Sequence, residues 1–328
     1  MTKLVTIFGG SGFVGRYIAR RMAKEGWRVR VAVRNPNEAM FVRTYGVVGQ
    51  VEPVFCNIRD DASVRAVSQG ADAVVNCVGV LDEVGMNTFD AVQADGAERV
   101  ARIAAGEGIT RMVQISAIGA DAESDSEYAC TKAAGEAGVL RHMPKAMILR
   151  PSIVFGPEDD FFNRFAGMTR FGPVVPVVGA DTLFQPVYVD DVAQAAVLGV
   201  TGGLSGVYEL GGPDVHTFRE LMGTMLHVIR RRRMVVNIPF PIARLMAFGF
   251  SVGRVLSLGM VRGPLTKDQV INLKNDNIVA QGAQGAQGFA TLGIAPVPME
   301  AILPDYLWRF RPSGQYSEIK ESARNLKA

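Results

Sequence analysis

The segment KLVTIFGGSGFVG, which runs from Lys3 to Gly15, decides the fold. A short apolar run, Leu4–Phe8, leads into a turn with four glycines, and a helical pattern follows. A strand that ends in such a turn presents backbone N–H groups to an anion at a helix N-terminus. In the spacing Gly9-x-x-Gly12-x-x-Gly15, the first glycine permits the tight turn, the second lets a pyrophosphate approach, and the third lets the helix pack on the strand. A purely structural turn is the alternative, because the chain has 36 glycines. The position between a first strand and a helix favours dinucleotide binding.

Composition narrows the class of protein. The chain has 328 residues, 48% of them hydrophobic, so we expect a folded α/β core and not a disordered chain. A formal charge of +3 is too small to imply nucleic-acid binding. We expect no signal peptide, because the first strand begins almost at once. The few cysteines and histidines are scattered, which predicts reduced thiols and no metal site. They are Cys56, Cys77, Cys130, His142, His216 and His227.

The first half of the chain alternates apolar strands with helical patterns. Continuous apolar strands separated by helices predict a doubly wound parallel Rossmann sheet, and six strands are enough for that fold. We therefore expect an NAD(P)-binding domain over residues 1–150. The expected strands are Leu4–Phe8, Val29–Val33, Val51–Phe55, Ala73–Val78, Met112–Ile115 and Ala146–Leu149, and the expected helices lie near 13–25, 61–69, 88–106 and 127–142.

After Arg150 the pattern becomes rich in proline and glycine. This predicts a smaller, irregular C-terminal α/β lobe over residues 151–312, interleaved with the first domain, and a charged tail over 313–328. Two Thr-x-x-Glu/Gln patterns, at Thr217 and Thr266, predict helix capping boxes. Further elements are expected at Gln185–Val189, Asp190–Val200, Val207–Leu210 and Met299–Arg309, and the repeat QGAQGAQG at 281–288 is expected to form a surface loop.

A long apolar region near 239–262 follows the basic run Arg230–Arg233. Prolines and arginines interrupt it, so it is too short to span a membrane. On a helical wheel its charged and polar positions fall within about 80° of one another, which indicates a cationic amphipathic helix. They are Arg244, Ser251, Arg254 and Arg262, while the other side carries Leu245, Met246, Phe248, Val252, Leu256 and Met260. We expect this segment to dock on a membrane surface or a partner. The alternative is an ordinary helix packed on its own domain.

The residue after the second strand indicates which nucleotide binds. A fold that prefers NAD usually has an acidic residue here, to hold the ribose 2′-hydroxyl. This chain has Arg34, which suits a 2′-phosphate, and Arg16 on the first helix could assist. NADPH is therefore the preferred cofactor, with NADH possible. The alternative is that Arg34 is a solvated loop residue.

Other candidate contacts lie where the third and fourth strands end, at the edge where open α/β sheets bind ligands. Asn57 and Ile58 are placed to contact an adenine, and Cys77, Val78 and Gly79 to line the path toward the nicotinamide. Strand ends also carry such residues to form turns, so each of them alone is weak support.

A Tyr-x-x-x-Lys pattern follows the fifth strand. Tyr128 and Lys132 lie one helical turn apart and so share a face. A nearby ammonium lowers the pKa of a phenol and makes it a usable general acid. The same lysine can hold the nicotinamide ribose, and Ser116 at the strand end can polarise a carbonyl.

These motifs resemble the extended or atypical branch of the short-chain dehydrogenase/reductase superfamily. The matching pieces are Gly9-x-x-Gly12-x-x-Gly15, Tyr128-x-x-x-Lys132, the segment RPSIVFGP from Arg150 to Pro157, and VYVDDVA from Val187 to Ala193. The resemblance is narrower to the Rossmann-type accessory subunits of respiratory complex I, in SAIGA from Ser116, FGPEDDFFN from Phe155, RFGP from Arg170 and QPVYVDD from Gln185. The cofactor contacts that it implies are Gly9, Gly10, Ser11, Gly12, Phe13, Val14, Gly15, Arg16, Pro151 and Ile153.

The resemblance implies an accessory subunit that holds NADPH without turnover. Its partners would be other complex I subunits, with no nucleic acid. It would lie peripherally on the cytoplasmic face of an inner (plasma) membrane, or on the matrix side in mitochondria. Many extended members use an asparagine after the fourth strand, but the matching place here has Gln93, which puts the usual proton relay in doubt. An active reductase or epimerase using Tyr128 is the alternative, and a redox-sensing regulator is a third.

Overall fold

A computed structural model describes residues 2–256, 265–280 and 287–312, with the side chains of 251–256 left out of the description. The chain divides into two compact units. Unit 1 comprises residues 1–152, 189–211 and 279–295, and unit 2 comprises 153–188, 212–278 and 296–328. The first segment of unit 1 ends close to the expected boundary at residue 150, but two later segments, 189–211 and 279–295, return to unit 1. The expected tail over 313–328 lies outside the described residues.

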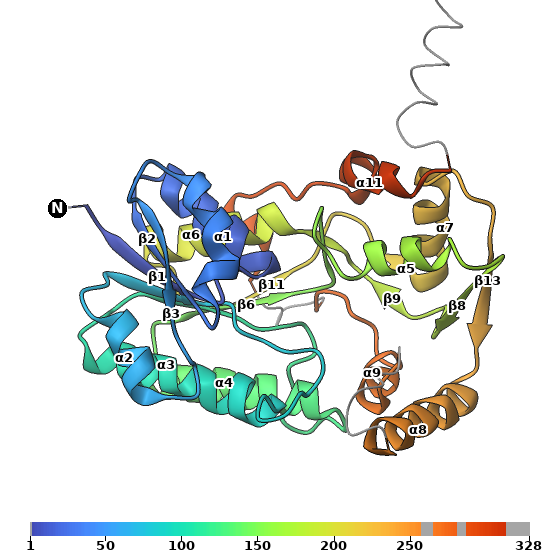
Figure 1. Cartoon of the computed structure of the whole chain (residues 1–328), viewed down its shortest axis with the longest axis horizontal. Helices are drawn as coiled ribbons and strands as arrows, with labels where there is room; N and C mark the ends of the chain where they lie inside the picture. Colours follow the sequence, from blue (N-terminus) through green and yellow to red (C-terminus); the bar gives the residue numbers. More distant parts are fainter. Residues whose placement is uncertain (1, 257–264, 281–286, 313–328) are drawn as a thin grey trace, which may run out of the picture. The chain divides into compact units, whose positions relative to one another are not determined.

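Unit 1 is built on a parallel sheet of seven strands, in the order β11-β6-β5-β4-β1-β2-β3 (Figure 1). The strands are β1 (Leu4–Phe8), β2 (Arg28–Val33), β3 (Val51–Phe55), β4 (Ala73–Asn76), β5 (Met112–Ile115), β6 (Met147–Pro151) and β11 (Gly206–Leu210). The doubly wound fold and its six expected strands are confirmed. The seventh strand, β11, was expected in the C-terminal lobe. It belongs to this sheet because it pairs in parallel with β6, Gly206 opposite Met147 and Leu210 opposite Pro151.

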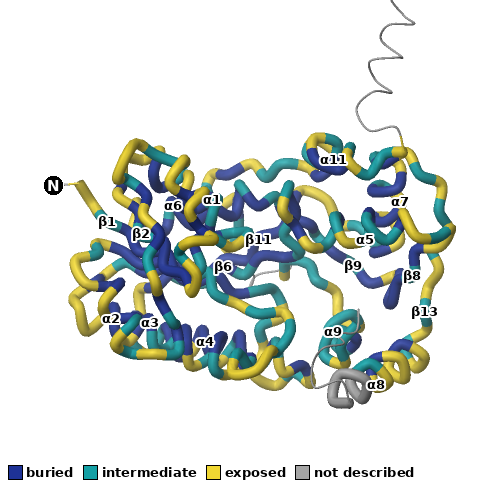
Figure 2. Tube along the Cα trace, in the orientation of Figure 1, coloured by how far each residue is buried: buried dark blue, intermediate teal, exposed yellow. Residues whose placement is uncertain are grey.

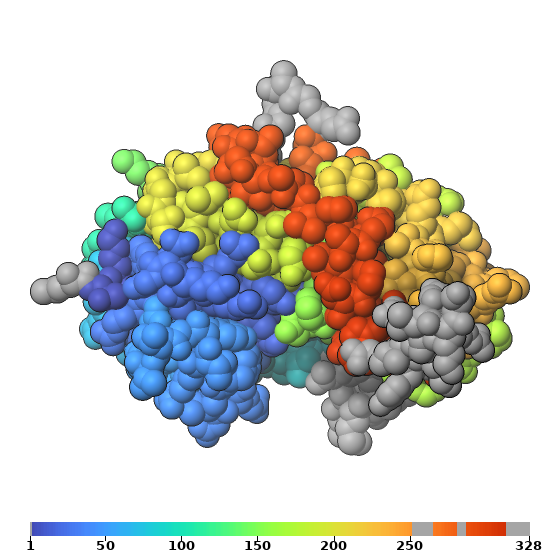
Figure 3. Space-filling view, turned by 90° about the horizontal axis from the view of Figure 1, so that it is seen from above, coloured from blue at the N-terminus to red at the C-terminus, as the bar shows by residue number. Residues whose placement is uncertain are grey.

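Helices cover both faces of this sheet. The helices of unit 1 are α1 (Phe13–Lys24), α2 (Asp61–Ser68), α3 (Asp95–Gly106), α4 (Glu127–His142), α6 (Val189–Gly202) and the short α10 (Phe289–Leu292), together with the 3-10 helix η1 (Pro36–Tyr45) and the π-helix η2 (Asp90–Ala94). Helices α2, α3 and α4 pack together on one face of the sheet, and α1 packs with α6 on the other face (Figure 1). Helix α10 lies against α6, as the orange segment beside the yellow surface in Figure 3 shows.

The core of the α2–α3–α4 face contains small and β-branched side chains. Val64 of α2, Val100 of α3 and Val139 of α4 are fully buried there against the strands. Figure 2 shows the same pattern as dark strands beneath helices whose outer faces are exposed. These helices follow the sheet because each one buries a single apolar stripe.

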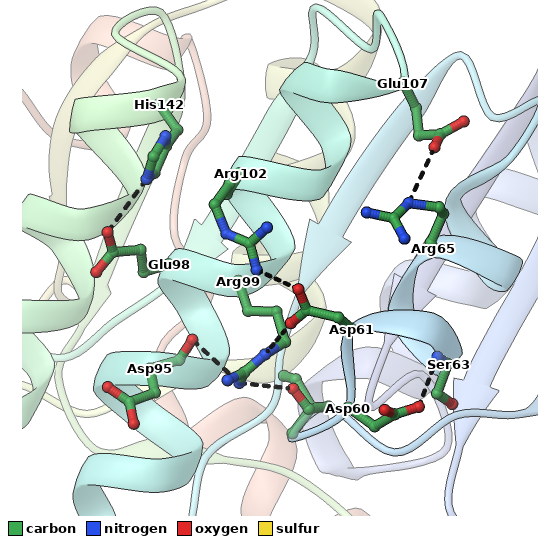
Figure 4. Close-up of polar contacts among 11 residues, drawn as sticks. Asp60, Asp61, Ser63, Arg65, Asp95, Glu98, Arg99, Arg102, Glu107 and His142 are labelled. Atoms are coloured by element: carbon green, nitrogen blue, oxygen red, sulfur yellow. Dashed lines mark hydrogen bonds and ion pairs between the residues drawn. The ribbon is translucent and has the colours of Figure 1, made fainter.

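Ion pairs link the outer edges of the same three helices (Figure 4). Asp61 at the start of α2 accepts hydrogen bonds from Arg102 (2.6 Å) and Arg99 (2.7 Å) of α3. Both arginines lower the pKa of the Asp61 carboxyl, Arg102 most. Glu98 of α3 pairs with Arg141 at 2.7 Å and His142 at 3.1 Å, both on α4. These contacts lie near the surface, where an ion pair contributes little to stability.

Unit 2 is irregular, as the sequence predicts. Its strands form three two-stranded pairs: β7 (Val154–Phe155) with β10 (Val187–Tyr188), β9 (Leu183–Phe184) with β12 (His216–Thr217), and β8 (Val174–Val178) with β13 (Met234–Ile238). Its helices are α5 (Phe162–Met168), α7 (Phe218–Val228), α8 (Phe240–Leu256), α9 (Lys267–Asn272), α11 (Met299–Leu307) and the 3-10 helix η3 (Trp308–Phe310). Both expected capping boxes are present, at Thr217 and Thr266.

Aromatic side chains fill the core of unit 2. Phe161 stacks on Phe218 with ring centroids 5.5 Å apart, and Phe165 and Phe184 each meet Phe218 edge to face.

Tyr306 of α11 packs at the edge of this core. Its hydroxyl donates to Asp159 (2.5 Å), a buried carboxylate that also accepts the N–H groups of Gly156 and Asn163. Burial raises the pKa of Asp159 despite these donors.

Candidate nucleotide site

The glycine turn lies at the carboxyl end of β1. Gly9 has a φ of +72°, which glycine adopts at little cost, and its N–H donates to Ala32 of the neighbouring strand (2.9 Å). The N–H of Gly12 returns to the Gly9 carbonyl (2.9 Å). A Cβ at Gly15 would overlap that same carbonyl oxygen and lie 2.8 Å from the Gly10 Cα. Only glycine at position 15 lets α1 begin so close to the turn.

The N-terminus of α1 lacks the side-chain cap that α2 and α4 have. Its N-cap is Gly12, so no side chain caps it, and its first turn contains no acidic residue. By contrast, Asp60 caps α2 and Ser126 caps α4 through side-chain oxygens. An uncapped helix N-terminus behind a tight glycine turn fits an anion such as a pyrophosphate. The residues present therefore fit the dinucleotide that the sequence predicts.

Arg16 and Arg34 lie in different surroundings. Arg16 donates from Nη2 to the Ser11 carbonyl (3.0 Å) and from Nε to the Gly12 carbonyl (3.3 Å). Its guanidinium also lies 4.9 Å from the ring centroid of Phe41 in η1, so Arg16 braces the turn. Arg34 is exposed directly after β2. Of the two, Arg34 has the more exposed side chain.

Asn57 and Ile58 follow β3. Asn57 forms a local turn, accepting at Oδ1 from the Arg59 N–H (3.2 Å). The Ile58 side chain is buried in the core beside Gly96 of α3. Any contact of Ile58 with an adenine would therefore involve its backbone and not its side chain.

The end of β4 connects the glycine turn to α4. Val78 lies beside Gly9, since a Cβ at Gly9 would meet the Val78 Cγ2 at 3.2 Å. A Cβ at Gly79 would meet the Lys132 Nζ at 3.3 Å. The Cys77 N–H extends the ladder by donating to Phe8 (2.9 Å), and burial raises the pKa of its thiol to about 12. Residues 77–79 thus bring the glycine turn and the lysine to one edge of the sheet.

Lys132 lies in a buried position on α4. Its Nζ is 5.7 Å from the ring centroid of Tyr128, one turn earlier. Burial lowers the pKa of Lys132 to about 8, with the carboxylate of Glu136 acting in the opposite direction. Phe89 meets the Tyr128 ring edge to face at 6.0 Å. The structure therefore brings Tyr128 and Lys132 together, as the spacing predicts.

Ser116 takes part in a contact that the sequence reasoning missed. Its N–H continues the sheet by donating to Leu149 (2.7 Å), and its hydroxyl donates to Oε1 of Glu136 (2.5 Å). Glu136 in turn accepts from Arg150, at Nε (2.9 Å) and Nη2 (2.6 Å). The available signal was the position of Glu136, four residues after Lys132 and on the same helix face.

Gln93 occupies the place where the resemblance implies an asparagine. It lies in the π-helix η2 and is 3% exposed. Its Nε2 donates to the Val80 carbonyl (3.0 Å), while its Oε1 has no hydrogen-bond partner among the described residues. Single π-turns within helices are often found at functional sites. The backbone carbonyl of Gln93 abuts Gly135 of α4, where a Cβ would overlap it.

Pro151 and Ile153 fall in different units. Pro151 ends β6 in unit 1, and its carbonyl accepts the Ile118 N–H (3.1 Å). Ile153 belongs to unit 2, where it packs against the aromatic core.

No group of three or more His, Cys, Asp or Glu side chains within residues 2–256, 265–280 and 287–312 could hold a metal ion. No helix of that same part of the chain is long and apolar enough to cross a membrane.

The sheet order, the glycine turn and the Tyr128–Lys132 pair define a nucleotide-binding Rossmann protein of the extended short-chain dehydrogenase type. The sequence pattern of the NAD dependent epimerase/dehydratase family matches residues 5–211. The chain belongs to this family, and its fold is that of a pyridine-nucleotide-binding protein.

Relatives confirm the narrower resemblance. NADH dehydrogenase (ubiquinone) 1 alpha subcomplex subunit 9, mitochondrial, of Arabidopsis thaliana is 34% identical over 95% of this chain and 79% of its own length. The NADH-ubiquinone oxidoreductase 40 kDa subunit of Neurospora crassa is 28% identical over 95% and 80%. A ceramide reductase of Caulobacter vibrioides is 30% identical over 73% and 74%.

Solved structures share the fold. The Bordetella bronchiseptica enzyme WbmH, in complex with NAD+, superposes with a TM-score of 0.68 at 17% identity, covering 96% of this chain and 100% of that one. The protein gox2253 has the same TM-score at 20% identity, covering 96% and 99%.

Proposed function

We propose that this chain is an NADPH-binding accessory subunit of a membrane-bound respiratory NADH:quinone oxidoreductase, and that it holds its nucleotide without turnover. The observation that carries the proposal is the 34% identity over 95% of the chain to a subunit of that name. In that setting the nucleotide would stabilise unit 1, because a ligand that binds only the folded state stabilises it by an amount that grows with the ratio of its concentration to its Kd.

Purification from native membranes tests this assignment. The chain should copurify with the other subunits of the oxidoreductase, and the extracted nucleotide should be NADP(H). Recovery of the chain as a freely soluble monomer at low salt would contradict the proposal.

NADPH preference is assigned to Arg34. Its exposed guanidinium follows β2, where a ribose 2′-phosphate would lie, whereas Arg16 is engaged by the turn. Arg34→Ala should weaken NADPH binding at least about tenfold and leave NADH binding nearly unchanged, as expected from losing a charge-assisted hydrogen bond. Arg28→Ala, at the exposed start of the same strand, is the matched control. Equal losses for both nucleotides in Arg34→Ala would exclude this role.

The face of α8 and β13 is proposed as the membrane-docking surface, with the chain peripheral on the matrix or cytoplasmic side. Large apolar side chains lie on its exterior: Met234, Val236, Ile242, Leu245, Met246 and Phe248. Arg244 is exposed among them, and there is no Asp or Glu between Glu220 and Asp268. Apolar side chains in a segment whose charged residues are all basic suit an anionic lipid surface. The other members of the expected cationic face, Ser251, Arg254 and Arg262, lie outside the described side chains.

Vesicle flotation tests the docking surface. The chain should float with phosphatidylcholine vesicles that contain phosphatidylglycerol and much less with phosphatidylcholine alone. Leu245→Ser with Phe248→Ser should abolish flotation, whereas Val47→Ser with Val48→Ser, an exposed apolar pair in unit 1, should not. If the α8 variant still floats with the vesicles, this surface is not the membrane-docking surface. If the chain binds purified subunits of the oxidoreductase but not vesicles, the surface docks on protein and not on lipid.

A reductase is the second candidate, favoured by the retained Tyr128–Lys132 pair and by the ceramide reductase relative. Stoichiometric NADPH oxidation with a carbonyl compound, lost in Tyr128→Phe, would support it. If no NADP⁺ accumulates with any compound of a broad carbonyl panel, the accessory role is favoured.

A further inference from the structure

Three helices of unit 2 end close together, and arginines follow each end. Helices α5, α7 and α11 pack against one another (Figure 1). Helix α5 is followed by Arg170, α7 by Arg231, Arg232 and Arg233, and α11 by Arg309. We call these five residues the arginine cluster, and all of them belong to unit 2.

Backbone carbonyls near the helix ends hold the guanidinium groups. Arg231 donates from Nε to the Phe310 carbonyl (2.9 Å). Arg233 donates from Nε to the carbonyl of Thr169, the residue after α5 (3.1 Å). The C-terminal end of a helix has a partial negative charge, so a basic residue there is an ordinary cap. Capping therefore explains where the arginines lie, but not how many there are.

The arginine cluster has more positive charge than the helix ends offset. Each helix C-terminus has about half a negative charge, which makes about 1.5 for three helices, against five guanidinium groups. Within the part of the chain that the structure describes, none of the five forms an ion pair with a carboxylate. Burial, and then the charges of Arg233 and Arg170, lower the pKa of Arg231. Because like charges repel, this excess favours a bound anion.

Two further features point to a protein as the source of that anion. Phe171 is 92% exposed, directly after Arg170. Arg170 and Arg309 both lie over the Phe310 ring, 5.0 and 5.3 Å from its centroid, which restricts their orientation. Arginine and aromatic side chains are enriched at protein interfaces. A guanidinium that is already oriented matches the two oxygens of a carboxylate and loses little freedom on binding.

We propose that the arginine cluster is a protein-docking surface for an acidic segment of another subunit. Asp or Glu side chains of that segment pair with the guanidinium groups, and Phe171 packs against the partner. This inference rests on the proposed accessory role and adds a protein contact to it. The cluster adjoins the proposed membrane-docking surface, because Met234 follows Arg233 directly. Anionic lipids attract Lys and Arg alike, whereas bidentate carboxylate binding needs the planar fork of Arg.

Rebinding to the oxidoreductase tests the arginine cluster. The probe is the purified complex from which this subunit has been removed, kept in a neutral detergent. A variant with Arg170→Lys, Arg231→Lys and Arg233→Lys keeps every charge but loses the planar forks. Its affinity for the complex should fall at least about tenfold, while its flotation with phosphatidylglycerol vesicles stays at the parent level. Arg20→Lys with Arg43→Lys, two exposed arginines of unit 1, is the matched control and should rebind as the parent does.

A charge reversal keeps the inference testable if the lysine variant does not fold. Arg232 is exposed, and its side chain makes no hydrogen bond to any residue that the structure describes. Arg232→Glu should therefore unfold in urea as the parent does, yet lose at least about tenfold in affinity for the complex. Arg20→Glu is its matched control and should keep the parent affinity.

A peptide probe tests the surface without the complex. Fluorescein-labelled octaglutamate should bind the parent chain, more weakly as salt increases, and at least about tenfold more weakly to Arg232→Glu. Octaglutamine should not bind. Parent-level rebinding in the folded cluster variants, or parent-level octaglutamate binding in Arg232→Glu, would overturn the inference. Loss of flotation in the lysine variant would overturn it too, because the cluster would then bind lipid. If the chain does not copurify with a respiratory complex, the proposed function fails, but octaglutamate binding that depends on Arg232 still supports this surface.

Discussion

Helices α1 and α8 use their apolar side chains in opposite ways. Helix α1 turns its large residues inward, and Ile18 and Met22 are fully buried. Helix α8 buries Ala243 and Ala247 against Val178 and Val270, while Leu245 is 71% exposed. A fully buried large apolar side chain contributes about 1.5–3 kcal/mol. Helix α1 therefore stabilises its own unit, whereas the large exposed side chains of α8 contribute little to the stability of the isolated chain.

The largest effect is expected where α1 meets the glycine turn. Gly15→Ala places a methyl group on the Gly9 carbonyl oxygen, so α1 must shift and the anion site must open. We expect a loss of about 3–5 kcal/mol in unfolding free energy and no measurable NADPH binding. Gly223→Ala, in α7 of unit 2 where a Cβ has open space, is the control and should gain about 0.5–1 kcal/mol. Urea unfolding measures the free energy of unfolding of each variant, and nucleotide titration measures its affinity for NADPH. A Gly15→Ala variant with the stability and NADPH affinity of the parent would contradict the close packing of α1 on the turn.

A matched pair of truncations tests the two helix faces directly. Ile18→Ala should cost about 2–4 kcal/mol, because it leaves a cavity under α1. Leu245→Ala should change the stability of the isolated chain by less than about 0.5 kcal/mol, because the side chain is exposed. Chemical denaturation compares them. Similar losses in the two variants would mean that α8 is already covered by its own chain.

The buried ammonium of Lys132 on α4 should make the stability of the chain depend on pH. Lys132 titrates at about 8 when folded and near its ordinary 10.5 when unfolded. Between these values the unfolded state binds more protons, so stability rises as the pH increases from 8 to 10.5. At 1.36 kcal/mol per pKa unit the gain is up to about 3 kcal/mol. Lys132→Met should lose this rise, measured as the difference between the two unfolding free energies at each pH. If the unfolding free energies of the parent and of Lys132→Met change with pH in parallel, the Lys132 ammonium is exposed to solvent.

Local sequence patterns predicted most elements of unit 1. The strand at Leu4–Phe8 and the helix at 127–142 match the structure to the residue. The strand is a continuous apolar run, and the helix has clear end signals, with Ser126 as its N-cap and Arg141 and His142 in its last turn. The assignment of β11 was wrong because a strand of five residues does not encode which sheet it joins. Its partner β6 lies more than fifty residues earlier, and only the long-range pairing decides.

The site was predictable in part for the same reason. The glycine turn and the Tyr128–Lys132 pair depend on spacing within one element, which the sequence shows. The contact between Ser116 and Glu136 depends on how the end of β5 packs against α4. The local sequence places Glu136 on the same helix face as Lys132, but it does not show that Ser116 meets it. The helical wheel for α8 identified an apolar side, but it could not show that alanines face inward while leucine and phenylalanine face outward.

The return of β11 to the sheet also restricts how the protein can be made. Strand β6 ends at Pro151, yet its outer neighbour is complete only at Leu210, and the Ala280 N–H that binds Glu209 comes later still. The first segment of unit 2, residues 153–188, must therefore be synthesised before the sheet of unit 1 can be completed. Until then β6 is an open edge, the kind that pairs with other chains. Expression of residues 1–152 alone should therefore yield aggregates and not a nucleotide-binding domain.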